Sequence, residues 1–287
     1  MTSVRSPGYP ALLMPLTLSV IFTAGACATA GNIDRGGKSV ADRSYRSPEL
    51  GIEESRFFRI RGVYRGTVIH QGKKNSFRQV FALEPPDRVR VEMLGPMGNP
   101  RLILAFDGRG AVGMYPREKI YFREEFEESA FVVFLGIPLA ARELVPLLTG
   151  EVFYREPDTR ILPPVAIEGG WRTVVSQAES GLHYVVILNG PDRRVLHVDL
   201  HRGDPEKHPP FLTVDYPAGT GKPLGPIPPR WEMYVPGANL RLAGTLIQIQ
   251  WEGVEFPEDV FQPRIPDGFR RVAAGDLAAD RSLLVNP

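Results

Sequence analysis

A short stretch late in the sequence, His197-Val-Asp199-Leu-His201, holds residue types that commonly bind zinc. On a β-strand, alternate side chains point to the same face, so both imidazoles and the carboxylate would lie together. The same alternation is found in an ordinary strand with one face in water, which is far commoner. We therefore predict no metal site and no cofactor.

A run of acidic residues, Glu124, Glu125, Glu127 and Glu128, is the strongest candidate for acid–base chemistry. Paired carboxylates perform such chemistry in glycosidases. Here they lie between an expected strand and an expected helix, where the helix dipole favours acidic side chains. The sequence also has no Gly-x-Ser-x-Gly elbow and no phosphate-binding loop. We predict a protein that is not an enzyme and has no catalytic residues.

The only cysteine of the 287 residues, Cys27, follows an N-terminal segment with the features of an export signal. Arg5 gives a weakly basic start, and residues 11–23 form an uncharged, mostly apolar stretch that is too short to span a bilayer. A single cysteine excludes an intramolecular disulfide, so an exported chain needs another explanation for it.

Small residues, Ala24-Gly-Ala26, stand directly before Cys27. They resemble the lipobox of bacterial lipoproteins, although Ala24 replaces the usual leucine. Ordinary signal peptidase would cut the same bond, because Ala24 and Ala26 also fit its rule, but it would leave a free thiol unexplained. We expect residues 1–26 to be removed as a signal peptide and Cys27 to carry the lipid anchor.

Composition limits the remaining possibilities. The net charge of +1 argues against a nucleic-acid partner, because such domains are usually strongly basic. The 29 glycines and 28 prolines favour many short strands joined by turns. We expect a flexible tether after the lipidated Cys27 over residues 27–52, one domain over 53–272 and a flexible tail over 273–287. No segment after the signal is long and apolar enough for a transmembrane helix.

Strand-like runs fill most of the domain. From Arg56 onward, apolar and polar residues alternate, which indicates a half-buried strand. Glycine- and proline-rich turns separate the later runs, as in an antiparallel meander. The expected strands are 56–65, 77–83, 88–94, 101–106, 110–115, 119–123, 171–176, 183–188, 194–201, 212–216, 229–234 and 240–251. Residues 151–170 fit either a loop or an added strand.

Two short helical stretches interrupt the strands, at 127–135 and 139–148. Each is apolar on one side, so that side must pack on the sheet or cover an apolar ligand. Gly150 is a stop signal for the second helix, and Pro146 is expected to distort it.

Several motifs together resemble the LolA/LolB family of periplasmic lipoprotein-handling proteins, with LolB nearest. Residues 88–104, R-V-R-V-E-M-L-G-P-M-G-N-P-R-L-I-L, resemble its strand, proline-apolar-glycine turn and following strand. Residues 134–139, F-L-G-I-P-L, and 147–150, L-L-T-G, are similar to segments around its helices. The closing F-Q-P-R-I-P-D-G at 261–268 is similar to C-terminal segments of the superfamily. The similarity covers residues 56–150 well and 170–272 loosely.

The resemblance implies a mainly β fold with some α-helix, an open antiparallel half-barrel of about eleven strands with short helices covering its concave face. It implies that this face is apolar and accepts acyl chains, and that Met97 corresponds to the apolar residue that the family inserts into the membrane. The helical residues that would line the acyl cavity or its lid are Phe131, Phe134, Leu135, Leu144 and Leu148. The same residues would serve equally in plain packing of helix on sheet.

The resemblance also implies a function: an outer-membrane lipoprotein that binds the acyl chains of lipoproteins or lipids and takes part in their transfer. A soluble LolA-like carrier is one expected partner, and the Cys27 lipid would attach the protein to the periplasmic face of the outer membrane. Ala28 supports this location, because an aspartate after the cysteine retains lipoproteins in the inner membrane. Two alternatives remain, a structural lipoprotein of an envelope complex, with a filled concave face, and a hydrolase or metal enzyme, with polar residues clustered in a cleft.

Overall fold

The computed structural model describes residues 45–47, 52–55, 59–95, 97–125, 139–152, 158–190, 193–217 and 225–279. The chain divides into two compact units, Met1–Val40 and Ala41–Pro287, and all described residues belong to the second. Among them, no helix is long and apolar enough to cross a membrane. Cys27 and the signal segment lie outside the described residues.

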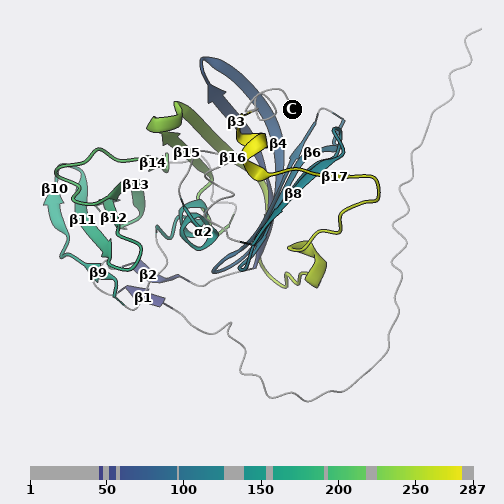
Figure 1. Cartoon of the computed structure of the whole chain (residues 1–287). Helices are drawn as coiled ribbons and strands as arrows, with labels where there is room; N and C mark the ends of the chain where they lie inside the picture. The colour runs from purple at the N-terminus through teal and green to yellow at the C-terminus, as the bar shows by residue number, and fades with distance from the viewer. Residues whose placement is uncertain are drawn as a thin grey trace, which may run out of the picture. The chain divides into compact units, whose positions relative to one another are not determined.

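One large curved sheet dominates this unit (Figure 1). Its strands run in the spatial order β10-β11-β12-β13-β14-β15-β16-β3-β4-β5-β6-β7-β8-β17, with β9 also paired to β11. Every pair is antiparallel except β17 with β8. The first half of the chain supplies β3 (Ile60–His70), β4 (Lys73–Glu84), β5 (Arg88–Leu94), β6 (Pro100–Asp107), β7 (Ala111–Tyr115) and β8 (Ile120–Glu124). The second half supplies β9 (Arg160–Ile161), β10 (Val165–Ile167), β11 (Gly170–Gln177), β12 (Leu182–Asn189), β13 (Val195–Arg202), β14 (Leu212–Asp215), β15 (Arg230–Val235), β16 (Leu240–Gln250) and β17 (Arg270–Arg271).

The sheet is mainly β and open, because β10 and β17 at its two ends do not pair with each other. This confirms the predicted open half-barrel. The structure has fifteen strands in the sheet of the described residues rather than about eleven. Two of the extra strands, β9 and β10, lie in 151–170, which the sequence left open as a loop or an added strand, and the third is β17. Each has two or three residues, and such short strands give almost no periodic signal.

The long β3–β4 hairpin shows how local sequence sets the register. Gln71 and Gly72 form its two-residue turn, both with positive φ, 50° and 76°. Two such residues make the turn whose twist matches that of the flanking strands. His70 therefore lies opposite Lys73, and the ladder continues without a shift to Ile60 opposite Leu83.

Glycines facing aromatic rings recur in the sheet. Four glycines lie directly across from an aromatic residue of the next strand, in the pairs Gly62–Phe81, Gly66–Phe77, Gly113–Phe122 and Gly244–Trp231. In each pair, a Cβ on the glycine would lie 2.6 Å or less from a ring atom. The rings occupy the space that side chains would take, and glycines at such positions allow a sheet to curve.

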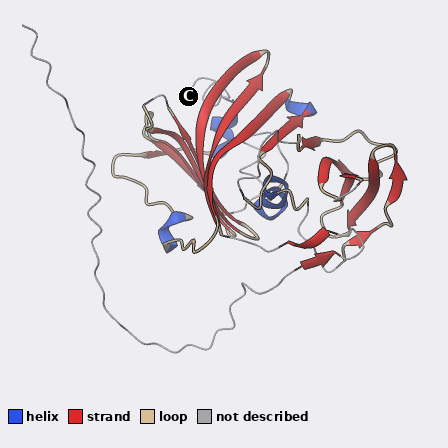
Figure 2. Ribbon diagram, turned by 180° about the vertical axis from the view of Figure 1, so that it is seen from behind, coloured by secondary structure: helices blue, strands red, loops and turns tan. Residues whose placement is uncertain are grey.

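The concave face of the sheet is packed around α2 (Ala141–Thr149), which lies between the two arms of the sheet (Figures 1 and 2). The helix runs unbroken through Pro146 and ends at Gly150, which has a left-handed φ of 79°. This confirms the second predicted helix and its stop. The first predicted helix, 127–135, lies outside the described residues.

Two regular segments lie where little structure was expected. β1 (Tyr45–Ser47) pairs with β2 (Ile52–Ser55), within or next to the expected tether. Helix α3 (Ala274–Ala279) lies in the expected flexible tail. It begins there because Ala274 is buried, 3% exposed, and the preceding Val272 donates its N–H to the carbonyl of Tyr121 at 2.9 Å.

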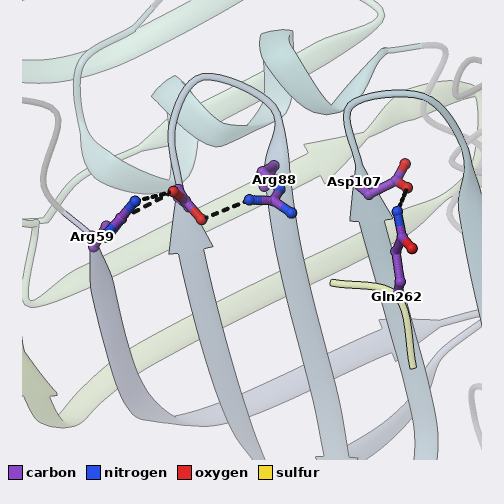
Figure 3. Close-up of polar contacts among 5 residues, drawn as sticks. Arg59, Arg88, Asp107 and Gln262 are labelled. Atoms are coloured by element: carbon purple, nitrogen blue, oxygen red, sulfur yellow. Dashed lines mark hydrogen bonds and ion pairs between the residues drawn. The ribbon is translucent and has the colours of Figure 1, made fainter. Parts of the chain in front are cut away.

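One end of the sheet is fixed by polar contacts (Figure 3). Glu84 forms ion pairs with Arg59 at 2.7 Å and with Arg88 at 3.0 Å. Gln262 donates to Asp107 at 2.7 Å and so ties the segment after β16 to the β6–β7 turn. The β3–β4, β5–β6 and β7–β8 turns lie at the opposite end of the sheet.

Candidate functional site

An apolar cavity of about 110 Å³ lies between α2 and the concave face. Strands from both halves of the chain contribute to it, because β16 pairs with β3. All its lining residues except Gln79 are hydrophobic: Val68, Phe77, Val89, Val91, Met93, Leu102, Leu104, Phe106, Leu144, Leu148, Trp231, Met233, Leu240 and Leu242. Such a surface has no group that could perform acid–base or nucleophilic chemistry, but it can bind hydrocarbon.

Helix α2 covers this cavity and is held by few polar contacts. The hydroxyl of Tyr216 donates to the carbonyl of Leu147 at 2.6 Å. Burial raises the pKa of this hydroxyl far above its usual range, so it stays protonated as a donor. At the start of the helix, the Glu143 carboxylate accepts a hydrogen bond of 2.7 Å from the N–H of Ala140. The apolar residues Leu144, Val145 and Leu147 of the helix are buried in the core.

The chain leaves α2 in an unusual conformation. Val152 is fully buried and has a φ of 79°, which is rare and strained for a β-branched residue. Between it and the helix, burial raises the pKa of Glu151 to about 7. Strained backbone and shifted carboxyls tend to gather at functional sites. Both lie at the C-terminal end of the helix that covers the cavity.

A second, larger hollow of about 750 Å³ opens at the end of the sheet that carries the β5–β6 turn. We call it the rim groove. It is lined by Arg65, Asn75, Ser76, Phe77, Arg78, Leu94, Gly95, Gly98, Arg117 and Ile247. Phe77 lines both the rim groove and the apolar cavity, so the two hollows are neighbours.

Met97 is at the tip of the β5–β6 turn and is 90% exposed. The turn is closed by hydrogen bonds of 2.9 Å from Gly98 N–H to the Gly95 carbonyl and from Gly95 N–H to the Asn99 carbonyl. Gly98 has a φ of 81°, which only glycine adopts easily. The turn therefore holds an apolar side chain out in solvent, beside the rim groove.

Three of the six residues predicted for the cavity, lid or membrane contact belong to the described part of the chain. Leu144 and Leu148 line the cavity, and Met97 is exposed rather than folded back on the core. Phe131, Phe134 and Leu135 lie outside the described residues. Sequence reasoning missed the strand residues that make most of the cavity wall, although the alternation in 60–70 and 88–94 could have indicated them. It also missed the arginines of the rim groove, for which the sequence carries no local signal.

The candidate metal ligands do not form a metal site. The Nε2 atom of His197 lies 2.8 Å from Asp199, and its Nδ1 atom lies 2.7 Å from Asp215. The main cause that raises the pKa of His197 to about 9 is its hydrogen bond to Asp199. His201 instead donates from Nδ1 to the carbonyl of His208 at 2.8 Å. A charged imidazole between two carboxylates is an ion-pair cluster, because both nitrogens carry protons. No group of three potential ligands in the described part of the chain could hold a metal ion.

Only two residues of the acidic run, Glu124 and Glu125, belong to the described part of the chain. Glu124 ends β8 and accepts a long hydrogen bond of 3.4 Å from the N–H of Ala274 at the start of α3. Glu125 lies one residue further, and Glu127 and Glu128 lie outside the described residues. The described acids therefore belong to the join between β8 and α3.

No protein-family model matches the chain, and none of the curated proteins does. Among solved structures, it is similar to a LolA superfamily protein from Nitrosomonas europaea, with 10% identity over 71% of this chain and 90% of that one, at a TM-score of 0.49. It is also similar to a structure described as a putative outer membrane lipoprotein-sorting protein domain from Vibrio parahaemolyticus. The identity is 12% over 72% of this chain and 91% of that one, at a TM-score of 0.49. A third similar structure is a DUF1329 family protein from Desulfovibrio piger. The identity is 10% over 71% of this chain and 89% of that one, at a TM-score of 0.47.

The Nitrosomonas europaea structure is described as a member of the superfamily that the sequence motifs resemble. At such identities and overlaps, the likeness says nothing of what this chain binds.

Proposed function

We propose that this chain is a lipoprotein, anchored through a lipid on Cys27 to the periplasmic face of the outer membrane, that binds acyl chains beneath α2. It takes part in the transfer or insertion of lipoproteins or lipids and is not an enzyme. The observation that carries the proposal is the hydrophobic cavity between α2 and the concave face. The sequence motifs shared with the LolA/LolB family support it.

The energetics favour an acyl ligand. Each methylene moved from water into an apolar site contributes about 0.8 kcal/mol, so a dry surface is enough for binding. The cavity of about 110 Å³ is smaller than the roughly 300–1,000 Å³ typical of ligand pockets, so a full acyl chain needs more room. We propose that α2 moves outward as a lid when the chain enters, and the polar contacts that hold it are few enough to allow this.

The cavity favours this function over the two alternatives. A structural lipoprotein predicts a filled concave face, and an enzyme predicts polar side chains in the cleft. Here the hollow is lined almost wholly by hydrocarbon, with Gln79 as the exception. The cargo would be the acyl chains of lipoproteins or lipids, delivered by a soluble LolA-like carrier.

Met97 completes the proposal as the residue that touches the bilayer. Its side chain is exposed at the tip of a turn held by glycine geometry. A single apolar side chain inserts only shallowly, so it would bring the cavity to the membrane surface rather than anchor the protein. Methionine is flexible and suits contact with disordered acyl chains.

The test is lipid binding by the chain with Cys27→Ser, which cannot carry the anchor. We expect native mass spectrometry to show co-purified lipid or acylated peptide, and a fluorescent fatty acid to bind. Leu148→Trp should fill the cavity and weaken uptake of the fatty acid at least tenfold. Leu162→Trp, the same change at a site 47% exposed and outside the cavity lining, should leave uptake unchanged. A ligand-free protein that also takes up no fatty acid would overturn the proposal.

A further inference from the structure

We propose that the rim groove is a docking site for the phosphates of anionic phospholipids at the membrane surface. Arg65 and Arg78 would bind the headgroups while the neighbouring Met97 enters the apolar layer. This inference rests on the proposed membrane contact of Met97. It adds a ligand class, the anionic lipid headgroup, and the residues that recognise it.

The first observation is a pair of like charges. Arg65 on β3 and Arg78 on β4 are direct partners across the two strands. Side chains at such positions share a face of the sheet with their Cβ atoms about 5 Å apart, and like charges placed there destabilise the pairing. Neither arginine forms an ion pair or a side-chain hydrogen bond with any other described residue. The fold itself gives no reason for this arrangement.

Three arginines in and beside the same sheet have an acidic partner. Arg59 and Arg88 pair with Glu84, and Arg90 pairs with Glu92. At the rim groove, Arg65, Arg78 and Arg117 line one hollow, and none of the three forms an ion pair with another described residue. This concentration of positive charge fits an anion from outside the protein.

The other walls of the groove suit a lipid headgroup. Arg117 contributes a third guanidinium from the β7–β8 turn, whose one acidic residue is the exposed Glu118. Leu94, Phe77 and Ile247 add apolar surface, and Ile247 is 43% exposed. Arginine binds phosphate in a bidentate manner. Guanidinium groups beside apolar side chains match a layer in which phosphates lie above acyl chains.

The rim groove lies directly beside the turn that carries Met97. Gly95 and Gly98, which flank the tip of the β5–β6 turn, form part of the groove wall. When Met97 enters the acyl region, the groove is brought to the level of the phosphates. Amphipathic surfaces of this kind lie with their apolar side about 5–10 Å inside the headgroup–acyl boundary. Phe77 then lies between the docked surface and the apolar cavity, which gives acyl cargo a short path.

The experiment measures binding of the chain with Cys27→Ser to phosphatidylcholine vesicles with and without phosphatidylglycerol. The test variant is Arg65→Gln/Arg78→Gln. The control, Arg160→Gln/Arg172→Gln, removes the same charge from exposed positions on β9 and β11, outside the groove. An arginine at an anionic surface changes membrane affinity about fivefold. We expect the test variant to bind phosphatidylglycerol vesicles on the order of thirtyfold more weakly, and the control less than threefold more weakly.

A second measurement tests whether residue 97, at the tip of the β5–β6 turn, enters the membrane. Met97→Trp supplies a fluorophore whose emission should shift to the blue on phosphatidylglycerol vesicles, and the shift should be lost when Arg65→Gln/Arg78→Gln is added. Equal weakening by the test and control variants would mean a diffuse charge effect and would overturn the proposal. Binding that does not depend on phosphatidylglycerol would overturn it as well.

Fatty-acid uptake separates this inference from the proposed function. Arg65→Gln/Arg78→Gln changes only exposed side chains outside the apolar cavity, so uptake should equal that of the parent protein. Uptake without anionic-lipid docking would refute the inference alone. Docking without uptake would refute acyl binding and leave the docking site in place.

Discussion

The ring of Phe77 lies over Gly66, its direct partner across β3 and β4. A Cβ on Gly66 would come within 2.2 Å of ring atom Cε2, so only glycine allows the ring to lie flat against the next strand. The same ring lines both the apolar cavity and the rim groove. A missing side chain on one strand thus fixes the wall that the two hollows share.

Gly66→Ala should displace this ring. The added methyl group overlaps the ring, and such overpacking costs about 1–3 kcal/mol of folding free energy. We expect a loss of that size in urea unfolding, together with weaker fatty-acid uptake. Gly237→Ala, where nothing lies within 4 Å of the added Cβ, is the matched control. Equal stability and uptake in the two variants would contradict this role of Gly66.

Tyr216→Phe should loosen α2. It removes the 2.6 Å hydrogen bond to the Leu147 carbonyl and leaves a buried acceptor without that donor, at a cost of about 1–2 kcal/mol. We expect a lower unfolding free energy and faster release of a bound fluorescent fatty acid in stopped-flow measurements. Tyr234→Phe, on β15 and outside the cavity lining, should change neither. Unchanged release from Tyr216→Phe would mean that this bond does not restrain the lid.

Glu151 should make stability depend on pH. Burial raises its pKa to about 7 from an ordinary value of 4.5. The folded state then holds the proton more tightly than the unfolded chain, so stability is highest below pH 4.5 and is lost as the pH rises to about 7. At pH 8, Glu151→Gln should be more stable than the parent by about 2 kcal/mol, and near pH 4 the difference should vanish. Glu168→Gln, in an exposed turn, is the matched control, and the same pH trend in both variants would contradict this role of Glu151.

His197 should make stability fall with rising pH in the same direction, but over a higher pH range. Its hydrogen bonds to Asp199 and Asp215 raise its pKa to about 9, from 6.5. Its contribution to stability is therefore fully present below pH 6.5 and is lost as the pH rises through about 9. Titration by NMR should give a midpoint well above 6.5, and Asp199→Asn should lower it. A midpoint at or below 6.5 in the parent protein would show that the ion-pair cluster does not form in solution.

Local sequence was a good guide to the strands. Alternation in 88–94 or 240–251 follows from strand geometry itself, since neighbouring side chains point to opposite faces, and β5 and β16 lie close to the expected bounds. Gly150 likewise marked the end of α2. The short strands β9 and β10 lie in 151–170, which the sequence left open as a loop or an added strand, and β17 was not predicted. Two or three residues form a strand only when a neighbour is present to pair with them.

The candidate site was predictable only in part. The helical residues Leu144 and Leu148 were expected in the cavity because one apolar face of α2 had to be covered. The ion pairs of His197 were not, because Asp215 comes from a different strand, β14. Contacts between residues distant in sequence depend on which strands become neighbours.

By itself, the sequence determined where strands and α2 form and which side chains share a face. These are local properties, set by φ, ψ and hydrophobic period. Only the tertiary structure decided that β16 closes onto β3, that space remains beneath α2, and that Arg65, Arg78 and Arg117 line one groove. The reason is physical: the neighbours of a strand and the volume left between packed elements depend on the whole sheet, and no single segment encodes them.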